Sequence, residues 1–420
     1  MRLRIERLVH GGQGMARSDG RPVFVDGGMP GDLAEVEITR DRKSFLIGRV
    51  RVVIEPGPEV SDPPCPHAGA CGGCPWQRLA YDNQLAQKHA ILVEQLVRIG
   101  KLPAGTLPDI TMLRAEPWEY RRSVKVAVRR GLFGFRQAGS ALVTPVERCL
   151  VADPAVTAVL DKARPVLSRV AEGELSVTSG DPGLATGLHL WLRRDPGDVK
   201  PIASRLLSAT GAAGLVITLG SDPKRRVYGT PCLPVEENLL APADGFVQPN
   251  RAVSRMMRDQ AASWCTEAGG GAAMADLYAG SGNFTRVLAR EACARDGTVT
   301  AVESFGPSCD CGRQGCQQWE GGRSVTFVHR PVTRELVDHP AFAVTPDLLL
   351  MDPPRAGAAD ALPLIEQWKP RTVVALSCDA ATFARDVGAL TAMGYGLKRL
   401  CLADQFPHTP HFESMGLLTR

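Results

Sequence analysis

A repeated order of strand, loop and helix from Phe246 to the end of the chain constrains the fold more than any other feature. Short apolar runs that end in small or acidic residues predict strands at 272–277, 298–302, 348–351 and 372–376, with helices between them. Parallel strands joined by helices form an open sheet with helices on both faces. The pattern therefore predicts an α/β domain that binds ligands at the carboxyl ends of its strands.

The composition is typical of a globular protein. A chain of 420 residues suggests two to four domains, and 44% of its residues are hydrophobic while 22% are charged. No apolar run approaches the roughly 18 residues of a membrane span, and the first residues lack the apolar stretch of a signal peptide. We therefore expect a cytoplasmic protein without membrane contact, and nothing in the sequence indicates an obligate protein partner.

A glycine-rich loop follows the first predicted strand of this domain. It reads Asp276-Leu-Tyr-Ala-Gly-Ser-Gly-Asn-Phe-Thr285 and leads into a helix predicted over 286–291. Glycines let the backbone approach a ligand, and the start of a helix offers free N–H donors. The next strand ends in Glu303, where a carboxylate can accept hydrogen bonds from ribose hydroxyls. The combination favours S-adenosylmethionine over NAD as the cofactor.

Reactive side chains follow the later strands. Asp352 ends one strand and precedes two prolines, and Cys378 follows the next strand just before a helix predicted over 380–390. A thiol at the start of a helix has a lowered pKa, so we expect Cys378 to be a nucleophile. Glu413 lies among apolar residues in the last predicted strand, where burial can raise a carboxyl pKa enough for base chemistry.

A thiolate, a carboxylate and a methyl donor together indicate one reaction. C5 of uracil is a poor nucleophile, but attack of Cys378 on C6 makes C5 electron-rich enough to accept a methyl group. Glu413 would then remove the C5 proton, and loss of the thiol would restore the ring. The base must leave its stack to be reached from both faces.

The first part of the chain predicts a small β-barrel. Apparent strands at 2–9, 21–25, 33–40 and 45–53 are joined by glycine-rich turns, and basic residues cluster around the last turn. Either a solvated loop or the rim of a nucleic-acid-binding barrel explains this cluster. A linker near residue 58, a helix with apolar spacing over 84–97 and a mostly β region from 117 to 240 follow. Within that region, residues 121–136 hold six basic residues and no acid. Either a half-buried strand over 123–129 with a charged outer face or a contact with an RNA backbone explains them.

Cysteines form two groups along the chain. Cys65, Cys71 and Cys74 lie close together, and Cys149 follows 75 residues after the third of them. Four thiolates suit an iron–sulfur cluster or tetrahedral zinc, and spacing alone leaves both open. Three more cysteines, Cys309, Cys311 and Cys316, lack a fourth ligand nearby, so we expect an irregular loop there. Without a secretory signal, a disulfide framework is not expected.

Taken together, the motifs resemble those of the RNA uracil-C5 methyltransferase family, and the resemblance runs essentially from end to end. The family motif S-C-x-P-A-T-x-x-R-D appears as Ser377-Cys-Asp-Ala-Ala-Thr-Phe-Ala-Arg-Asp386, with alanine in place of proline. The motif D-x-F-P-H-T-x-H-x-E-S appears as Asp404-Gln-Phe-Pro-His-Thr-Pro-His-Phe-Glu-Ser414. The resemblance implies that Cys378 is the nucleophile and Glu413 the general base.

The resemblance also implies ligands for the other sites. The expected cofactor-binding residues are Gln248, Tyr278, Gly280, Gly282, Asn283, Glu303 and Asp352. The spacing of Cys65, Cys71, Cys74 and Cys149 matches members that carry a [4Fe-4S] cluster, for which we expect a structural role. Residues 1–58 resemble the TRAM RNA-binding domain.

The sequence thus predicts three domains: a TRAM-like or OB-like β-barrel over 1–58, a mixed α+β domain with the cluster over 59–245, and a class I, Rossmann-like methyltransferase domain over 246–420. The helix near 84–100 is a candidate for packing on the last domain. The expected substrate is RNA, with 23S rRNA favoured and tRNA second. Two remoter alternatives are a radical S-adenosylmethionine enzyme acting on RNA and a non-catalytic RNA-binding factor.

Overall fold

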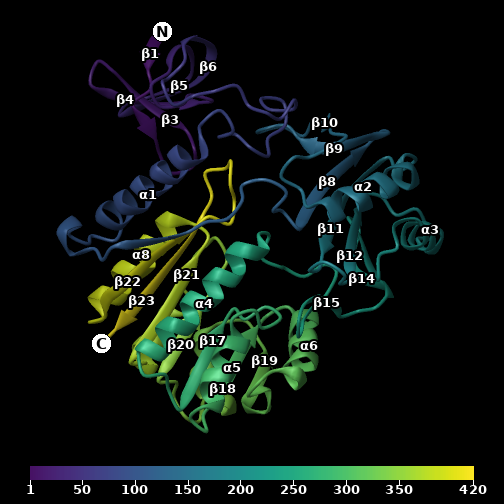
Figure 1. Cartoon of the computed structure of the whole chain (residues 1–420), viewed down its shortest axis with the longest axis vertical. Coiled ribbons are helices and arrows are strands. Elements are labelled where there is room, and N and C mark those ends of the chain that lie inside the picture. Colours follow the sequence, from purple (N-terminus) through teal and green to yellow (C-terminus); the bar gives the residue numbers. More distant parts are fainter.

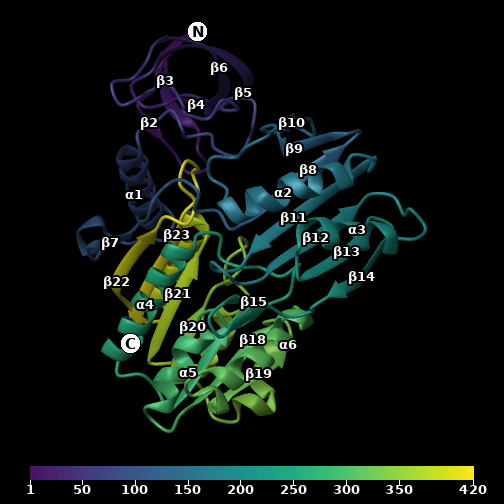
Figure 2. The same ribbon diagram turned by 45° about the vertical axis from the view of Figure 1, so that its right-hand side comes forward.

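Three large β-sheets, each formed mainly by a different part of the chain, carry the fold (Figure 1). The computed structural model describes residues 1–420. The N-terminal sheet lies at one end, the middle sheet beside it and the C-terminal sheet at the other end (Figure 2). The exact domain boundaries at 58 and 245 stay a prediction.

The N-terminal sheet is curved around a small apolar core that includes Ile5, Ala16 and Val23. Its strands are β1 (Arg2–Arg4), β2 (Arg7–Leu8), β3 (Gly14–Ser18), β4 (Arg21–Asp26), β5 (Leu33–Arg42) and β6 (Phe45–Glu55), in the order β1-β5-β6-β4-β3-β2. The strand predicted over 2–9 is divided in two, because Ile5 donates its N–H to Asp32 while Glu6 donates to Met15. β3 was not predicted from the sequence.

The middle sheet has seven strands and two helices on one core. Its order is β10-β9-β8-β11-β12-β13-β14, and β12 and β13 are its only parallel neighbours. The strands are β8 (Ser123–Arg129), β9 (Leu132–Arg136), β10 (Val143–Pro145), β11 (Glu172–Ser179), β12 (Thr186–Leu192), β13 (Gly214–Leu219) and β14 (Asp222–Gly229), with α2 (Pro154–Leu167) and α3 (Lys200–Thr210). The strand predicted over 123–129 is confirmed. A separate hairpin, β15 (Leu233–Glu236) and β16 (Leu239–Ala241), leads to the last sheet.

The C-terminal sheet has eight strands in the order β19-β18-β17-β20-β21-β23-β22-β7, of which β7 (Ile110–Leu113) comes from before the middle sheet. The run from β19 to β21 is parallel, and β23 pairs antiparallel with both β21 and β22. The strands are β17 (Ala273–Leu277), β18 (Thr298–Glu303), β19 (Val325–His329), β20 (Leu348–Met351), β21 (Thr372–Ser377), β22 (Gly396–Ala403) and β23 (Glu413–Thr419). Helices α4 (Arg251–Glu267), α5 (Thr285–Cys293), α6 (Gly306–Gly315), α7 (Leu362–Trp368) and α8 (Ala380–Ala392) pack around it. The predicted Rossmann-like sheet is confirmed.

A segment from before the middle sheet completes this C-terminal unit. β7 (Ile110–Leu113) adds a parallel edge strand beside β22, and α1 (Tyr81–Arg98) packs on α8. Leu92 and Leu96 of α1 share one buried core with Phe383 of α8. The helix ends where Gly100 meets α8 so closely that a Cβ there would lie 2.9 Å from the Ala384 carbonyl oxygen. Only glycine permits this approach.

The irregular loop expected around Cys309, Cys311 and Cys316 is wrong, because α6 covers most of it. Pro307 suits the first turn of a helix. Glycine and cysteine are poor helix formers, but packing overrides propensity here. A Cβ at Gly312 would lie 2.4 Å from the Phe327 ring, so the bare backbone of α6 rests directly on that side chain.

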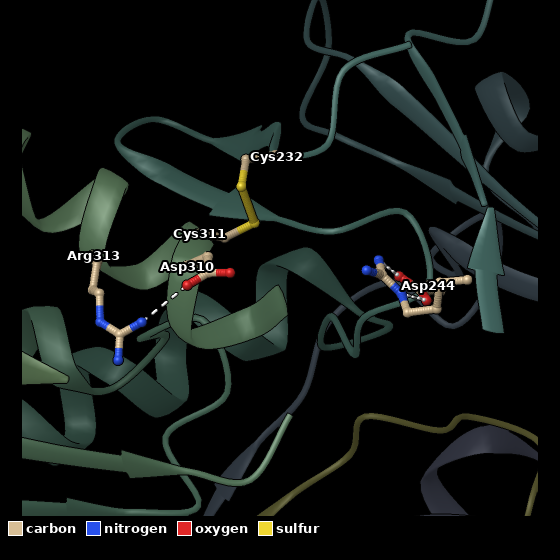
Figure 3. Close-up of a disulfide and its surroundings, with 6 residues drawn as sticks. Cys232, Asp244, Asp310, Cys311 and Arg313 are labelled. Atoms are coloured by element: carbon tan, nitrogen blue, oxygen red, sulfur yellow. Dashed lines mark hydrogen bonds and ion pairs between the residues drawn. A yellow bond between two sulfur atoms is a disulfide. The ribbon is translucent and has the colours of Figure 1, made fainter. Parts of the chain in front are cut away.

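One disulfide joins the hairpin region to α6. It links Cys232, just before β15, to Cys311 in α6, and an ion pair between Asp310 and Arg313 lies on the same helix (Figure 3). The other ten cysteines are free thiols. The structure thus contains one disulfide that the sequence did not predict, and no disulfide framework. No helix has the length and apolar character needed to cross a membrane.

The N-terminal sheet contacts the C-terminal unit through the loop between β2 and β3. His10 Nε2 lies 3.3 Å from Asp379 Oδ2, at the start of α8. The Gly12 carbonyl accepts a hydrogen bond from the Trp76 indole, and a Cβ at Gly12 would lie 2.8 Å from Pro410. Arg7 also donates to Glu94 of α1. The β2–β3 loop is therefore part of a defined interface.

This interface predicts a pH-dependent contribution to stability. The hydrogen bond to Asp379, and then its charge, raise the pKa of His10 above its ordinary value near 6.5. The contribution is therefore fully present below pH 6.5 and lost as the pH rises through the raised pKa. We expect His10→Ala to lower the unfolding temperature measurably at pH 6 and hardly at pH 9, as measured by thermal unfolding at low salt.

The control is His89→Ala, since His89 is exposed on α1 and forms no ion pair. Its unfolding temperature should match that of the unsubstituted protein at both pH values. A His10→Ala effect that is equal at pH 6 and pH 9 would contradict a charged contact.

Candidate active site

The C-terminal sheet brings the predicted reactive residues to one edge. Tyr278, Asp352 and Cys378 each follow the carboxyl end of a parallel strand, namely β17, β20 and β21. β23 runs in the opposite direction, so its first residue, Glu413, lies at the same edge. Ser377 pairs with Ser414, and the antiparallel register therefore brings Cys378 beside Glu413.

A cleft at this edge contains most of the predicted cofactor-binding residues. Gln248, Tyr278, Gly280, Asn283 and Asp352 line it. Glu303 and Gly282 are not in its lining but adjoin it. The Glu303 carboxylate accepts a hydrogen bond from the Gly280 N–H at 2.9 Å. Gly282 has a φ of +95°, and a Cβ added to it would lie only 2.3 Å from the Trp319 ring. Only glycine fits at 282, so this residue shapes the loop.

The cleft suits a polar ligand. Gln248 Oε1 and Asn283 Nδ2 are buried and have no hydrogen-bond partner within the protein. The Gln248 amide donates only a long contact of 3.4 Å to Asp352. Buried polar groups are normally paired, so unpaired ones facing a cleft mark a ligand site. These residues therefore fit a cofactor rich in hydroxyl, amino and carboxylate groups.

A buried carboxyl group, that of Glu413, and a half-buried one, that of Asp352, lie near Cys378. Glu413 is 3% exposed, and its Oε2 has no hydrogen-bond partner within the protein. Burial raises the pKa of Glu413 well above its usual range, and the charge of Asp352 raises it further. Burial likewise raises the pKa of Asp352. Since two neighbouring carboxylates cannot both ionise freely, the pair can hold a proton near neutral pH, as a base that exchanges protons requires.

The expected lowering of the Cys378 pKa is wrong. Burial raises the pKa of this thiol to about 12, and the charges of Glu413 and Asp352 add to the effect, while Arg355 opposes it. The helix that follows does not compensate, because Asp379 accepts the Ala381 and Thr382 N–H groups at its start. A carboxylate at that position neutralises the partial positive charge of the helix end.

A buried ion pair holds the loop that leads to Glu413. Lys88 of α1 donates to Asp404 at 2.7 Å and to the Phe406 carbonyl at 3.1 Å, and both charged side chains are 0% exposed. Lys88 was not predicted from the sequence as part of the site. Its signal was present, since Lys88 lies three residues from both Leu85 and Ile91, on the apolar face of the helix. A lysine on such a face requires a buried partner.

The four predicted cluster ligands lie around one cavity. Cys65, Cys71, Cys74 and Cys149 all line a space of about 390 Å³ between the loop before α1 and the middle sheet. Gly72 donates its N–H to the Arg136 carbonyl, which ties this loop to β9. No three histidine, cysteine, aspartate or glutamate side chains anywhere in the chain converge closely enough to hold a single metal ion. The thiols are thus gathered around a space but do not form a site for one ion.

Comparison with known proteins relates the chain to one family. Residues 1–50 match the TRAM domain, and residues 337–420 match the tRNA (Uracil-5-)-methyltransferase family. Proteins named 23S rRNA (uracil(1939)-C(5))-methyltransferase RlmD are similar over nearly the whole chain. The protein from Pectobacterium atrosepticum is 32% identical over 97% of this chain and 90% of its own, and that from Alkalilimnicola ehrlichii is 34% identical over 99% and 96%.

A solved structure matches the whole fold. The Pyrococcus abyssi tRNA (uracil-54, C5)-methyltransferase in complex with S-adenosyl-L-homocysteine superimposes with a TM-score of 0.74, covers 100% of both chains and is 18% identical in sequence. This match supports the three-part architecture, and the sequence matches to the named relatives establish the relationship. The chain therefore belongs to the family of S-adenosylmethionine-dependent RNA uracil-C5 methyltransferases.

Proposed function

We propose that this protein methylates C5 of a uridine in 23S rRNA through a covalent adduct between Cys378 and C6 of the base. The observation that carries the proposal is the pairing of β21 with β23, which brings Cys378 beside Glu413 and near Asp352, a residue of the cleft lining. The named relatives support the choice of RNA. Family membership argues against a radical enzyme and against a non-catalytic RNA-binding factor.

The proposed reaction uses two side chains in sequence. The Cys378 sulfur adds to C6 of the uracil, and the electron pair of the C5–C6 double bond makes C5 nucleophilic. S-Adenosylmethionine, when bound, supplies the electrophilic methyl group that C5 accepts. Glu413 then removes the C5 proton, and the S–C6 bond breaks so that the double bond reforms. A raised pKa makes the Glu413 carboxylate, once it has lost its own proton, a stronger base, and a stronger base removes a carbon-bound proton more readily.

Formation of the thiolate needs help, because the pKa of Cys378 is about 12. Arg355 is the cation whose charge favours this thiolate, and it follows the two prolines after Asp352. A bound cationic cofactor acts in the same direction, because positive charge near a thiol lowers its pKa. We therefore propose that the thiolate forms mainly after the cofactor is bound.

Substitution of the two reactive residues tests the mechanism. Cys378→Ser should abolish trapping of 5-fluorouridine-containing RNA as a covalent complex, because no sulfur is left to add to C6. Glu413→Gln should lower turnover by about 10²- to 10⁴-fold, as expected for loss of a general base. It should also accumulate the methylated adduct on ordinary RNA, which denaturing gels would detect. The control is Cys293→Ser at an exposed thiol, and turnover by Cys378→Ser would refute the mechanism.

The choice of substrate RNA has its own test. The family match over 337–420 carries a tRNA name, so transfer RNA is the second candidate. We expect labelled methyl groups to enter unmodified 23S rRNA, and transfer RNA at most at background level, when each is incubated with the protein and labelled cofactor. Preferential labelling of transfer RNA would overturn the assignment to 23S rRNA.

We further propose that Cys65, Cys71, Cys74 and Cys149 hold a [4Fe-4S] cluster with a structural role. Two observations support it. The four thiols line one cavity of about 390 Å³, which has room for a multi-atom cluster with four thiolate ligands. The cysteine segment also links all three sheets, since Gly72 bonds to β9, the Trp76 indole to Gly12 and the Trp76 N–H to the His408 carbonyl.

Metal analysis of protein purified without oxygen tests this proposal. We expect about four iron and four sulfide per chain, with the visible absorption of a cluster. Cys74→Ser should lose the iron and the absorption, whereas Cys316→Ser, at a thiol outside the cavity, should retain both. One zinc per chain without sulfide would favour the zinc alternative and refute the cluster.

A further inference from the structure

An arginine from the middle of the chain reaches into the cofactor cleft of the C-terminal domain. Arg122 immediately precedes β8 and is 0% exposed. It lines the cleft together with Gln248, Asn283 and Asp352. No other arginine and no lysine lines this cleft. The position is notable because Arg122 is fixed to a different sheet from the glycine-rich loop.

The guanidinium group of Arg122 is only partly paired. Its Nε donates to the Gln248 carbonyl at 2.8 Å, and one terminal nitrogen donates to Glu236 Oε1 at 2.8 Å. The other terminal nitrogen is buried and has no hydrogen-bond partner within the protein. Its nearest carboxylate oxygen, on Asp181, is 3.6 Å away. The side chain is therefore held rigidly at two nitrogens while the third can still donate.

The charges around Arg122 leave room for an anion. Arg122, Arg258 and Arg286 all donate to the one carboxylate of Glu236, which is 4% exposed. The buried guanidinium groups of Arg122 and Arg258 and the half-buried one of Arg286 therefore share a single carboxylate. Asp181 lies near Arg122, but Arg255 and Arg251 also contact it. Asp276 and Asp352 also line the cleft, but burial raises the pKa of each to about 7, so Arg122 is the group there that pairs best with a ligand carboxylate.

Two further donors lie in the same cleft. Asn283 Nδ2 and Ser281 Oγ, both from the glycine-rich loop, are buried without hydrogen-bond partners. The orientation of the Asn283 amide is fixed, because its oxygen accepts a hydrogen bond from Arg258 at 2.8 Å. A carboxylate has two oxygens that each accept more than one hydrogen bond, so it can use an arginine, an amide and a hydroxyl together.

We propose that Arg122 binds the α-carboxylate of the methionine portion of S-adenosylmethionine, with Asn283 and Ser281 as additional donors. The inference rests on the proposed function, which requires this cofactor. The carboxylate is the only anionic group of the cofactor, and Arg122 is the only cationic side chain in the cleft lining. Arg122 immediately precedes β8 of the middle sheet. A cofactor bound to Arg122 would therefore also join the middle sheet to the C-terminal sheet.

A comparison of two ligands tests this assignment without measuring catalysis. S-Adenosylhomocysteine carries the carboxylate, and its decarboxylated analogue, S-adenosyl-3-thiopropylamine, lacks it. We expect the unsubstituted protein to bind S-adenosylhomocysteine about 10- to 100-fold more tightly in calorimetry, as is typical of a charged hydrogen bond. Arg122→Gln should weaken binding of S-adenosylhomocysteine by that factor and leave binding of the analogue within about twofold.

The matched control is Arg286→Gln. Arg286 donates to the same Glu236 carboxylate but does not line the cleft, so its loss should affect both ligands equally. Should Arg122→Gln fail to fold, Arg122→Lys keeps the charge beside Glu236 but offers a shorter, single-point donor. It should still reduce the preference for S-adenosylhomocysteine.

Three results would overturn the assignment. Arg122→Gln could weaken both ligands equally, which would indicate a purely structural role. The unsubstituted protein could bind the two ligands equally well, which would leave the carboxylate without a partner. If it bound neither ligand, both this inference and the proposed function would fail, whereas the first two results leave the proposed function standing.

Discussion

The buried ion pair between Lys88 and Asp404 is the interaction on which the arrangement of the active site most depends. It joins residues 316 positions apart, and both side chains are completely buried. Removing one partner of such a pair typically costs about 3–5 kcal/mol, because the other charge is left without compensation. The pair fixes the start of the loop that ends at Glu413. The same loop receives the Trp76 N–H at the His408 carbonyl, so the cysteine segment is attached to it as well.

Electrostatics at the sheet edge explains why the site needs its ligands. The carboxyl groups of Asp276, Asp352 and Glu413 all have raised pKa values, because burial opposes ionisation, and the charge of Asp352 adds to this effect at Asp276 and Glu413. Burial, and then the charges of Glu413 and Asp352, keep Cys378 protonated. A sulfonium cation bound among these groups would relieve the repulsion and favour the thiolate. Arg122 lies beside Gln248 in a cleft that acidic side chains also line. The cleft therefore offers both a cation and acids, which suits the carboxylate and the ammonium group of a zwitterionic amino acid.

Residues in local motifs were predictable, and residues that act across domains were not. Cys378 and Glu413 lie in distinctive segments of sequence, and the strands that carry them follow from apolar runs. Lys88 and Arg122 gave only weak signals, since a lysine or arginine is usually exposed unless a distant partner neutralises it. The helix α6 was missed because its glycines and cysteines disfavour helix, and only contact with Phe327 compensates. The tertiary structure also decides that four cysteines line one cavity, namely Cys65, Cys71, Cys74 and Cys149. This depends on how the loop before α1 packs against β9.

The sequence alone determined the class of the C-terminal sheet, the position of the glycine-rich loop and the chemical types of the reactive residues. These depend on periodicity and on short motifs, which are local properties of the chain. The tertiary structure decided the pKa of Cys378, the partner of Lys88 and the direction in which Arg122 points. Ionisation and pairing depend on burial and on charges within a few ångströms, and those neighbours come from segments that are distant in the sequence.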